Sequence, residues 1–183
     1  MRRDMEKTEK AGSTEPGTVS IGQQFDLLAV VDTFCCWYRQ ALADRNLQLT
    51  TKISPQLPRY FLGNEILTRH VLYQPAKNSF LYLGSGEVLL EIAAEQLAGR
   101  RYALSCNLTL AGRGVPPARE KELFQPYPGH ARQSIRDGFR LRCANLYYAR
   151  IIARLLGGDL RLDTRAGSGT RYRLEIRLLA GLG

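Results

Sequence analysis

The last quarter of the chain constrains the fold more than any other part. Residues 140–156, RLRCANLYYARIIARLL, carry apolar side chains at helical spacing, and Gly157 and Gly158 follow directly. Glycine there favours the end of a helix, because glycine readily adopts the left-handed backbone found after helix C-termini. Residues 159–179 are typical of two strands joined by a Gly-rich turn at RAGSG. An amphipathic helix that leads into a hairpin predicts a sheet on which helices pack.

The preceding residues predict further elements in mixed order. Periodicity favours helices at residues 25–46, 64–81 and 116–124, and strands at residues 47–54, 87–96 and 100–110. Residues 55–63 are expected to be a Pro-punctuated connection, and residues 126–139 a loop. This order predicts an α+β two-layer sandwich, a mixed sheet covered on one face by helices. Residues 1–20 are polar and predict a flexible tail before a single domain at 21–183.

Two of the expected helices begin next to a residue suited to capping. Asp26 and Asn64 can each accept a hydrogen bond from the turn that follows. Pro75 lies inside the second helix, where it removes a backbone donor and is expected to cause a kink. The residues of this helix expected to face inward are Ile66, Leu67, Val71 and Leu72.

The charge balance favours an acidic partner. The chain has 26 Lys and Arg against 17 Asp and Glu, a formal net charge of +9. No nucleic-acid-binding signature accompanies this excess, and the arginines are spread over the second half of the chain. Of three explanations, nucleic acid, an anionic membrane surface and an acidic protein partner, we therefore expect the acidic protein partner and no nucleic acid. The alternative is a basic surface that serves only solubility.

Hydropathy predicts neither a membrane span nor export. No run approaches the apolar length of a transmembrane helix. The N-terminal residues lack the apolar middle of a secretory signal. Cys35 and Cys36 lie in an apolar helical pattern, which indicates reduced core cysteines. A cytoplasmic location is the resulting expectation.

Three strings, and their order, resemble the ATP-binding domain of bacterial sensor histidine kinases. They are residues 57–92, residues 112–127 with the rhythm Gly-x-Gly-Val-Pro, and residues 148–178 with Leu-Gly-Gly, a strand and Gly-x-Gly-Thr. DNA gyrase B and MutL share this domain, which is known as the GHKL or Bergerat fold. The resemblance runs from Phe25 to Leu179 and implies the same two-layer architecture.

The resemblance implies that an Asn-containing helix supplies a Mg²⁺ ligand beneath the triphosphate of ATP. Asn78 is at the principal position, and one amide oxygen with phosphates and waters satisfies Mg²⁺. The companion asparagine, one turn earlier, is replaced by Gln74. The basic residue expected three positions after Asn78 is Leu81, although Lys77 is adjacent. The alternative is that Asn78 only makes a hydrogen bond within the helix.

Other nucleotide-contacting positions depart from the family pattern. The aspartate that accepts a hydrogen bond from adenine aligns with Leu110, which has no acceptor. Gly112 and Gly114 remain, and in the family they let the backbone approach the nucleotide. A second glycine motif wraps the phosphates, a role that needs bare backbone amides at a helix start. Its glycines are replaced by Leu141, Cys143 and Asn145.

These changes predict a catalytically degenerate domain that docks another protein in bacterial two-component signalling and does not hydrolyse ATP. An acidic receiver domain or a sensor kinase is the expected partner, and no cofactor is expected. The vestigial ATP-binding residues would be Asn78, Lys77, Gly112 and Gly114, with Asn78 also the metal ligand. The partner-binding residues would be Arg132, Arg136, Arg140, Arg142, Arg150 and Arg154.

Two other functions remain open. An active stand-alone GHKL ATPase or protein kinase, similar to the anti-sigma-factor kinases, would bind ATP and Mg²⁺ through Asn78, Lys77 and the two glycines. The altered pocket would instead take a cyclic dinucleotide if Arg132, Arg136 and Arg140 paired bidentately with its phosphates. A solvated basic loop is the simpler interpretation of these three arginines.

Overall fold

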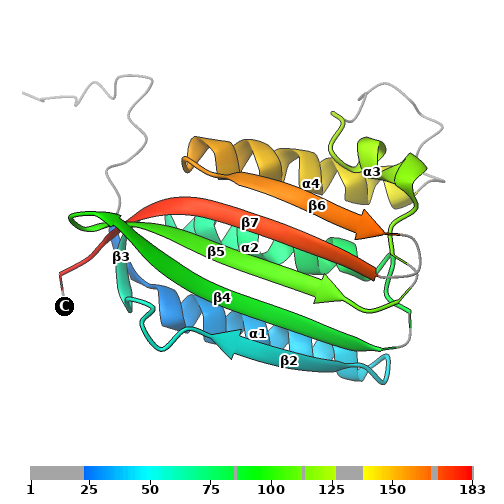
Figure 1. The fold of residues 1–183 in the computed structure, drawn as a ribbon, viewed down its shortest axis with the longest axis horizontal. Helices are drawn as coiled ribbons and strands as arrows, with labels where there is room; N and C mark the ends of the chain where they lie inside the picture. The colour runs from blue at the N-terminus through cyan, green and yellow to red at the C-terminus, as the bar shows by residue number, and fades with distance from the viewer. Residues whose placement is uncertain (1–22, 85, 113, 127–137, 166–168, 183) are drawn as a thin grey trace, which may run out of the picture.

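Helices and strands alternate irregularly along the chain in the computed structural model (Figure 1). The structure describes residues 23–84, 86–112, 114–126, 138–165 and 169–182. The helices are α1 (Leu27–Ala43), α2 (Glu65–Ser79), α3 (Pro117–Leu123) and α4 (Gly138–Leu155). The strands are β1 (Gln23–Asp26), β2 (Gln48–Ile53), β3 (Tyr60–Gly63), β4 (Glu87–Ala98), β5 (Arg101–Leu110), β6 (Asp159–Arg165) and β7 (Gly169–Ala180). The expected tail and most of the expected loop at 126–139 lie outside the described residues.

The seven strands form one mixed sheet in the order β1-β3-β7-β5-β4-β2, with β6 also paired to β7. β2 and β4 are parallel, and the other described pairs are antiparallel. β6 pairs with the first half of β7, from Arg165 opposite Gly169 to Asp159 opposite Glu175. Figure 1 shows α1, α2 and α4 against one face of the sheet. The predicted α+β two-layer sandwich is therefore confirmed.

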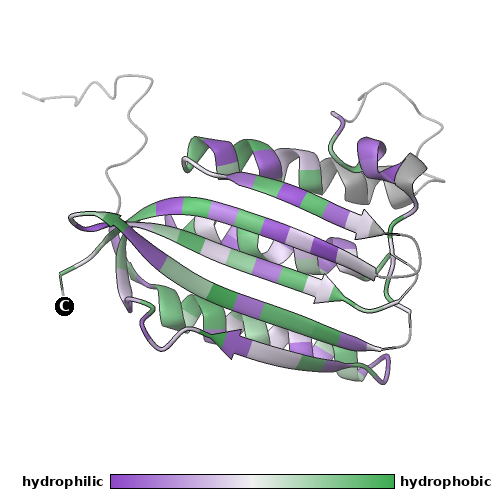
Figure 2. Ribbon diagram, viewed as in Figure 1, coloured by the Kyte–Doolittle hydropathy of each residue, from purple (hydrophilic) through white to green (hydrophobic). Residues whose placement is uncertain are grey.

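Alternating burial separates the two faces of the sheet. Along β7 the even-numbered residues from Thr170 to Leu178 are buried, and the intervening residues point the other way. β5 repeats this pattern, with Leu104, Cys106, Leu108 and Leu110 buried. Figure 2 shows the resulting alternation of hydrophilic and hydrophobic residues along these strands. The buried side chains face the helices and form the core, while the odd-numbered residues line a face that no described helix covers.

An aromatic cluster packs α2 against α1. The Tyr73 ring lies 5.0 Å, between centroids, from the rings of both Phe34 and Trp37. The hydroxyl oxygens of Tyr38 and Ser79 are 2.6 Å apart in the buried interior. Aromatic pairs of this kind add about 0.5–1.5 kcal/mol each beyond the area they bury. The helix expected to contact a nucleotide is thus held rigidly at both its middle and its end.

Both predicted helix caps are confirmed. Asp26 Oδ1 accepts a hydrogen bond from the backbone of Ala29 at 3.0 Å, and Asn64 Oδ1 accepts one from Leu67 at 3.0 Å. α2 continues through Pro75 as far as Ser79. At the other end of the chain, Gly157 has a φ of 77° directly after α4, as expected for a helix end.

Gly158, in the connection between α4 and β6, is needed for a different reason. A Cβ atom at Gly158 would lie 1.8 Å from the carbonyl oxygen of Glu175 on β7. No side chain fits between the backbones at this point. Glycine therefore lets the chain pass close to β7 after α4, so that β6 can pair with β7 immediately.

Three sequence-based expectations are wrong in detail. The connection at 55–63 contains β3, whose Phe61 is buried through pairing with β1 and β7. Phe25 belongs to β1 and not to the first helix. Ile66 is 78% exposed, because the buried face of α2 begins at Thr68 and continues through Val71 and Leu72. The spacing of apolar residues did not indicate this face, because the polar residue Thr68 forms part of it.

Of the two adjacent cysteines expected in the core, only Cys35 is buried, and Cys36 is exposed. Both are free thiols.

Candidate functional site

The side chain of Asn78 is buried at the end of α2, with 2% of its surface exposed. The hydroxyl of Tyr172, on β7, donates a hydrogen bond of 2.9 Å to Asn78 Oδ1. Asn78 Nδ2 has no hydrogen-bond partner in the part of the chain that the structure describes. The oxygen that would ligate a cation is therefore already an acceptor inside the core.

One turn earlier, Gln74 is also buried, with 6% of its surface exposed. Its Nε2 is 3.5 Å from His70 Nε2, and its Oε1 has no hydrogen-bond partner among the described residues. Lys77 is exposed, with its Nζ 6.0 Å from the centroid of the Tyr73 ring. Burial, and then the charge of Lys77, lower the pKa of His70 below its usual range, so the imidazole is neutral at pH 7. An amide oxygen, a neutral imidazole and an ammonium group thus lie within two turns of α2.

Leu110 ends β5 inside the hydrophobic core, with 2% of its surface exposed. It lies opposite Val88 of β4 and Thr170 of β7. Gly112 and Gly114 follow with φ values of 130° and 73°, which favour glycine. The position aligned with the adenine-binding aspartate therefore carries a hydrocarbon side chain that packs into the core.

Hydrogen bonds tie the loop after these glycines to the β6–β7 hairpin. The backbone N–H of Val115 donates to Thr170 Oγ1 at 2.9 Å, and Thr164 Oγ1 donates to the Val115 carbonyl at 2.9 Å. A Cβ atom at Gly169 would lie 2.1 Å from the carbonyl oxygen of Leu110. The glycine of the Gly-x-Gly-Thr string is thus required by close contact between strands.

The sequence of this domain matches a known protein family. Residues 63–180 match the family described as histidine kinase-, DNA gyrase B-, and HSP90-like ATPase. The chain belongs to this family.

Solved histidine kinases share the fold of this ATPase-family domain. Full-length ShkA in complex with AMPPNP superposes with a TM-score of 0.66 and 20% identity, over 88% of this chain and 32% of that one. The histidine kinase AdeS of Acinetobacter baumannii gives a TM-score of 0.57 and 18% identity, over 84% of this chain and 66% of that one. The hybrid signal transduction protein dokA of Dictyostelium discoideum is 22% identical over 170 residues. The chain spans 10% of the length of that relative.

The family's Asn-containing helix fits α2 in two registers one turn apart. In the first, Asn78 takes the principal position and Leu81 takes the basic one. In the second, Gln74 takes the principal position, His70 its companion, and Lys77 the basic position three residues later. The spacing to Lys77 is the sequence signal for the second register, which our sequence analysis missed. In this second register Asn78 has no role in nucleotide binding. It serves the packing of the core, through its hydrogen bond with Tyr172.

Of the six arginines predicted to bind a partner, the structure describes the side-chain contacts of two, Arg150 and Arg154. Arg132 and Arg136 lie outside the described residues, and Arg140 and Arg142 lie in the first two turns of α4. Asp159 accepts hydrogen bonds from Arg150 Nε at 2.9 Å and Arg154 Nε at 3.1 Å. These last two arginines are therefore paired within the domain.

Asp159 also pairs with Arg161, whose Nε is 3.3 Å from Asp159 Oδ2. Burial alone would raise the pKa of Asp159, but the hydrogen bonds and charge of Arg150, with Arg161 and the Leu160 N–H, lower it to about 2. Three guanidinium groups surround one carboxylate, so the cluster stays positive.

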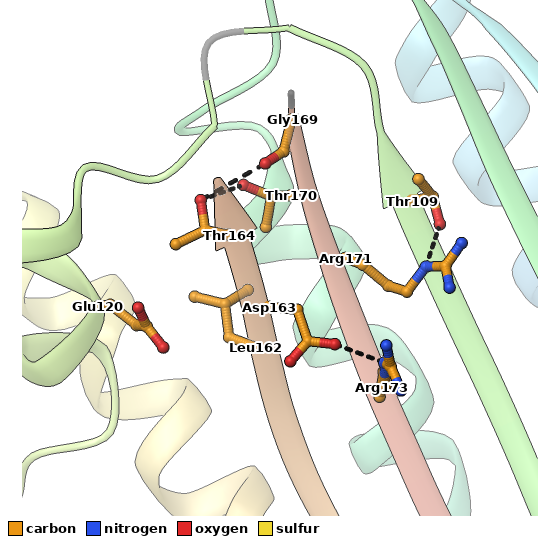
Figure 3. A pocket seen from close by; sticks show the side chains of 9 residues that line it. All are labelled: Thr109, Glu120, Leu162, Asp163, Thr164, Gly169, Thr170, Arg171 and Arg173. Carbon is orange, nitrogen blue, oxygen red and sulfur yellow. Dashed lines mark hydrogen bonds and ion pairs between the residues drawn. The ribbon is translucent and has the colours of Figure 1, made fainter. Parts of the chain in front are cut away.

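A separate hollow of about 620 Å³ opens where β6 and β7 meet, partly on the uncovered face of the sheet (Figure 3). Arg171 Nε donates to Thr109 Oγ1 at 3.0 Å, and Arg173 pairs with Asp163. Glu120 of α3 completes the charged lining. Two arginines and two carboxylates line the hollow, so its formal charges balance. None of Asn78, Gln74 and Leu110 lines it.

The residues that the structure describes lack two further features. No helix there is long and apolar enough to cross a membrane. No group of three or more His, Cys, Asp or Glu side chains in the same residues is placed to hold a metal ion.

Proposed function

We propose that this histidine-kinase-like ATPase-family domain docks a signalling protein in a two-component pathway and does not hydrolyse ATP. The observation that carries the proposal is Leu110, which is buried in the core at the position that reads adenine. An adenine amino group placed there would lose its hydrogen bond to water and gain none.

Burying the adenine amino group beside Leu110 would carry an appreciable free-energy penalty. A buried polar group without a partner costs about 1–3 kcal/mol, which weakens binding roughly 5- to 150-fold. If Asn78 were the Mg²⁺ ligand, its amide oxygen would also have to exchange its Tyr172 hydrogen bond for the cation. Together with the replaced glycines at 141, 143 and 145, these features fit ATP and Mg²⁺ poorly.

The proposed partner is an acidic protein, such as a receiver domain or a sensor kinase. The net charge of +9 favours encounter with an acidic surface and raises the association rate. Arg154 and Arg161 keep 58% and 71% of their side chains exposed while they pair with Asp159. Both can therefore face a partner without losing their internal contact.

Isothermal titration calorimetry with ATP and Mg²⁺ tests the loss of nucleotide binding. We expect no saturable heat up to about 1 mM ATP, because the unpaired adenine amino group and the replaced glycines at 141, 143 and 145 carry separate penalties. Two penalties of about 2–3 kcal/mol each would raise a Kd of about 1 μM into the millimolar range. A cooperative thermal unfolding curve of the same sample is the control that the domain is folded. Saturable binding with a Kd below about 100 μM would refute the proposal.

A second candidate, an active stand-alone ATPase or protein kinase, is favoured by one observation. The Oε1 atom of Gln74 is buried without a hydrogen-bond partner among the described residues, and Lys77 is one turn away. Buried oxygens of this kind usually have a partner, and a hydrated cation supplies one. If ATP binds, Gln74→Leu should abolish the binding, and Asn78→Leu should leave it within about threefold.

A further inference from the structure

Three large apolar side chains are exposed together on α4. Tyr148, Ile151 and Leu155 expose 54%, 37% and 76% of their surfaces. Residues at positions i, i+3 and i+7 share one face of a helix, so the three form a continuous strip, here called the α4 stripe. Single exposed apolar residues are ordinary, but a contiguous row on one helix marks a contact surface.

The α4 stripe is not needed for packing within the domain. The opposite side of α4 carries the buried residues Leu146, Ala149 and Ala153. Through these and their neighbours, α4 contacts α2, α3, β6 and β7. Figure 1 shows α2 between α1 and α4, so α4 stands at the edge of the helix layer. The stripe therefore lies on the side of α4 away from the core.

The charges beside the stripe decide what can cover it. From Gly138 to Leu155 the helix contains four arginines and no acidic residue. Arg154 is adjacent to Leu155, and with Arg150 and Arg161 it shares the single carboxylate of Asp159. A second copy of α4 would bring arginines against arginines with no carboxylate on the facing helix. Like charges across an interface disfavour such pairing, whereas an acidic partner would gain from it.

We propose that the α4 stripe docks an amphipathic helix of an acidic partner protein. Apolar residues at i, i+3 and i+7 of that helix cover Tyr148, Ile151 and Leu155, and its flanking Asp or Glu residues meet Arg154. Helix-to-helix docking of this kind uses apolar anchors for affinity and flanking charges for orientation. The inference rests on the proposed docking role and adds the surface and the chemistry of the partner.

The probe is a synthetic 21-residue peptide with Leu at helical a and d positions and Glu at the flanking positions. Fluorescence anisotropy measures its binding to the full chain at low and at physiological salt. We expect saturable binding that weakens with salt. Leu155→Ser and Ile151→Ser should each weaken peptide binding about tenfold, because complete burial of such a side chain strengthens binding by about 10- to 100-fold. The same peptide with Lys in place of Glu should bind at least about tenfold more weakly.

Ile66→Ser is the matched control. Ile66 is 78% exposed on α2, so its replacement removes as much exposed apolar surface as Leu155→Ser but away from α4. It should leave the affinity for the Glu peptide unchanged. Arg154→Gln should weaken binding several-fold without loss of stability, because Arg150 and Arg161 still pair with Asp159.

Absence of peptide binding, equal binding of the Glu and Lys peptides, or equal effects of Ile66→Ser and Leu155→Ser would overturn the inference. A concentration-dependent dimer that Leu155→Ser dissociates would also overturn it, because a second copy would then cover the stripe. The peptide titration contains no nucleotide. ATP binding would therefore refute the loss of nucleotide binding alone, and failure of the peptide would refute the α4 stripe alone.

Discussion

The contact between Tyr172 and Asn78 distinguishes a structural asparagine from a cation ligand. Tyr172→Phe removes the hydroxyl that donates to Asn78 Oδ1 and leaves that oxygen buried without this donor. We expect the free energy of unfolding to fall by about 1–3 kcal/mol, the usual penalty for a buried unpaired polar group. For a domain of this size, the thermal midpoint should fall by about 2–4 °C per kcal/mol.

A variant of the acceptor, Asn78→Leu, tests whether the two side chains act as a pair. Asn78→Leu removes both the acceptor and the amide Nδ2, which has no partner among the described residues. Tyr172→Phe should therefore be less damaging in the Asn78→Leu background than in the wild type, a favourable coupling of about 1 kcal/mol or more. Urea unfolding of the four proteins, followed by circular dichroism, measures this cycle.

Tyr147→Phe is the control, because Tyr147 is half-buried and its hydroxyl makes no hydrogen bond within the described residues. Its effect should stay within about 0.5 kcal/mol. The reasoning fails if Tyr172→Phe is as stable as the wild type. It also fails if the chain binds ATP and Asn78→Leu weakens that binding, because the oxygen would then serve a ligand and not the core.

Three further predictions follow from packing and charge. Gly158→Ala should destabilise the domain by more than about 3 kcal/mol in urea unfolding, because its Cβ would overlap the Glu175 carbonyl, whereas Gly84→Ala, with no atom within 4 Å, should be neutral. The pKa of Asp159 is lowered from 3.8 to about 2, so its contribution is present above pH 4 and lost as pH falls towards 2. Unfolding measured between pH 5 and pH 2 should therefore lose about 2 kcal/mol that Asp159→Asn does not lose. Leu110→Asp should cost more than about 3 kcal/mol in the same unfolding assay and should not create ATP binding in calorimetry, since it buries a carboxylate in the core.

The candidate site shows where sequence reasoning reached its limit. Leu110 could be identified from the sequence because the Gly-x-Gly rhythm at 112–114 fixes its alignment, and the replaced glycines could be identified from their place at the start of the long helix. The asparagine helix was harder, since Gln74 and Asn78 differ by one turn and share the same periodic pattern. The spacing from Gln74 to Lys77 favours the second register, and the buried contact of Asn78 with Tyr172, 94 residues away, supports it. The exposure of the α4 stripe likewise depends on which side of α4 meets α2 and β6.

The amino-acid sequence alone determined the helices with strong periodicity, their caps at Asp26 and Asn64, the closing hairpin and the family. These features depend on residues within a few positions of one another, and local backbone and hydrogen-bond preferences set them. Tertiary structure alone decided that residues 60–63 form a strand and that Ile66 is exposed. It also decided that three arginines share Asp159. These outcomes depend on partners brought together by the sheet, and no local pattern encodes the free energy of contacts between residues so distant in the chain.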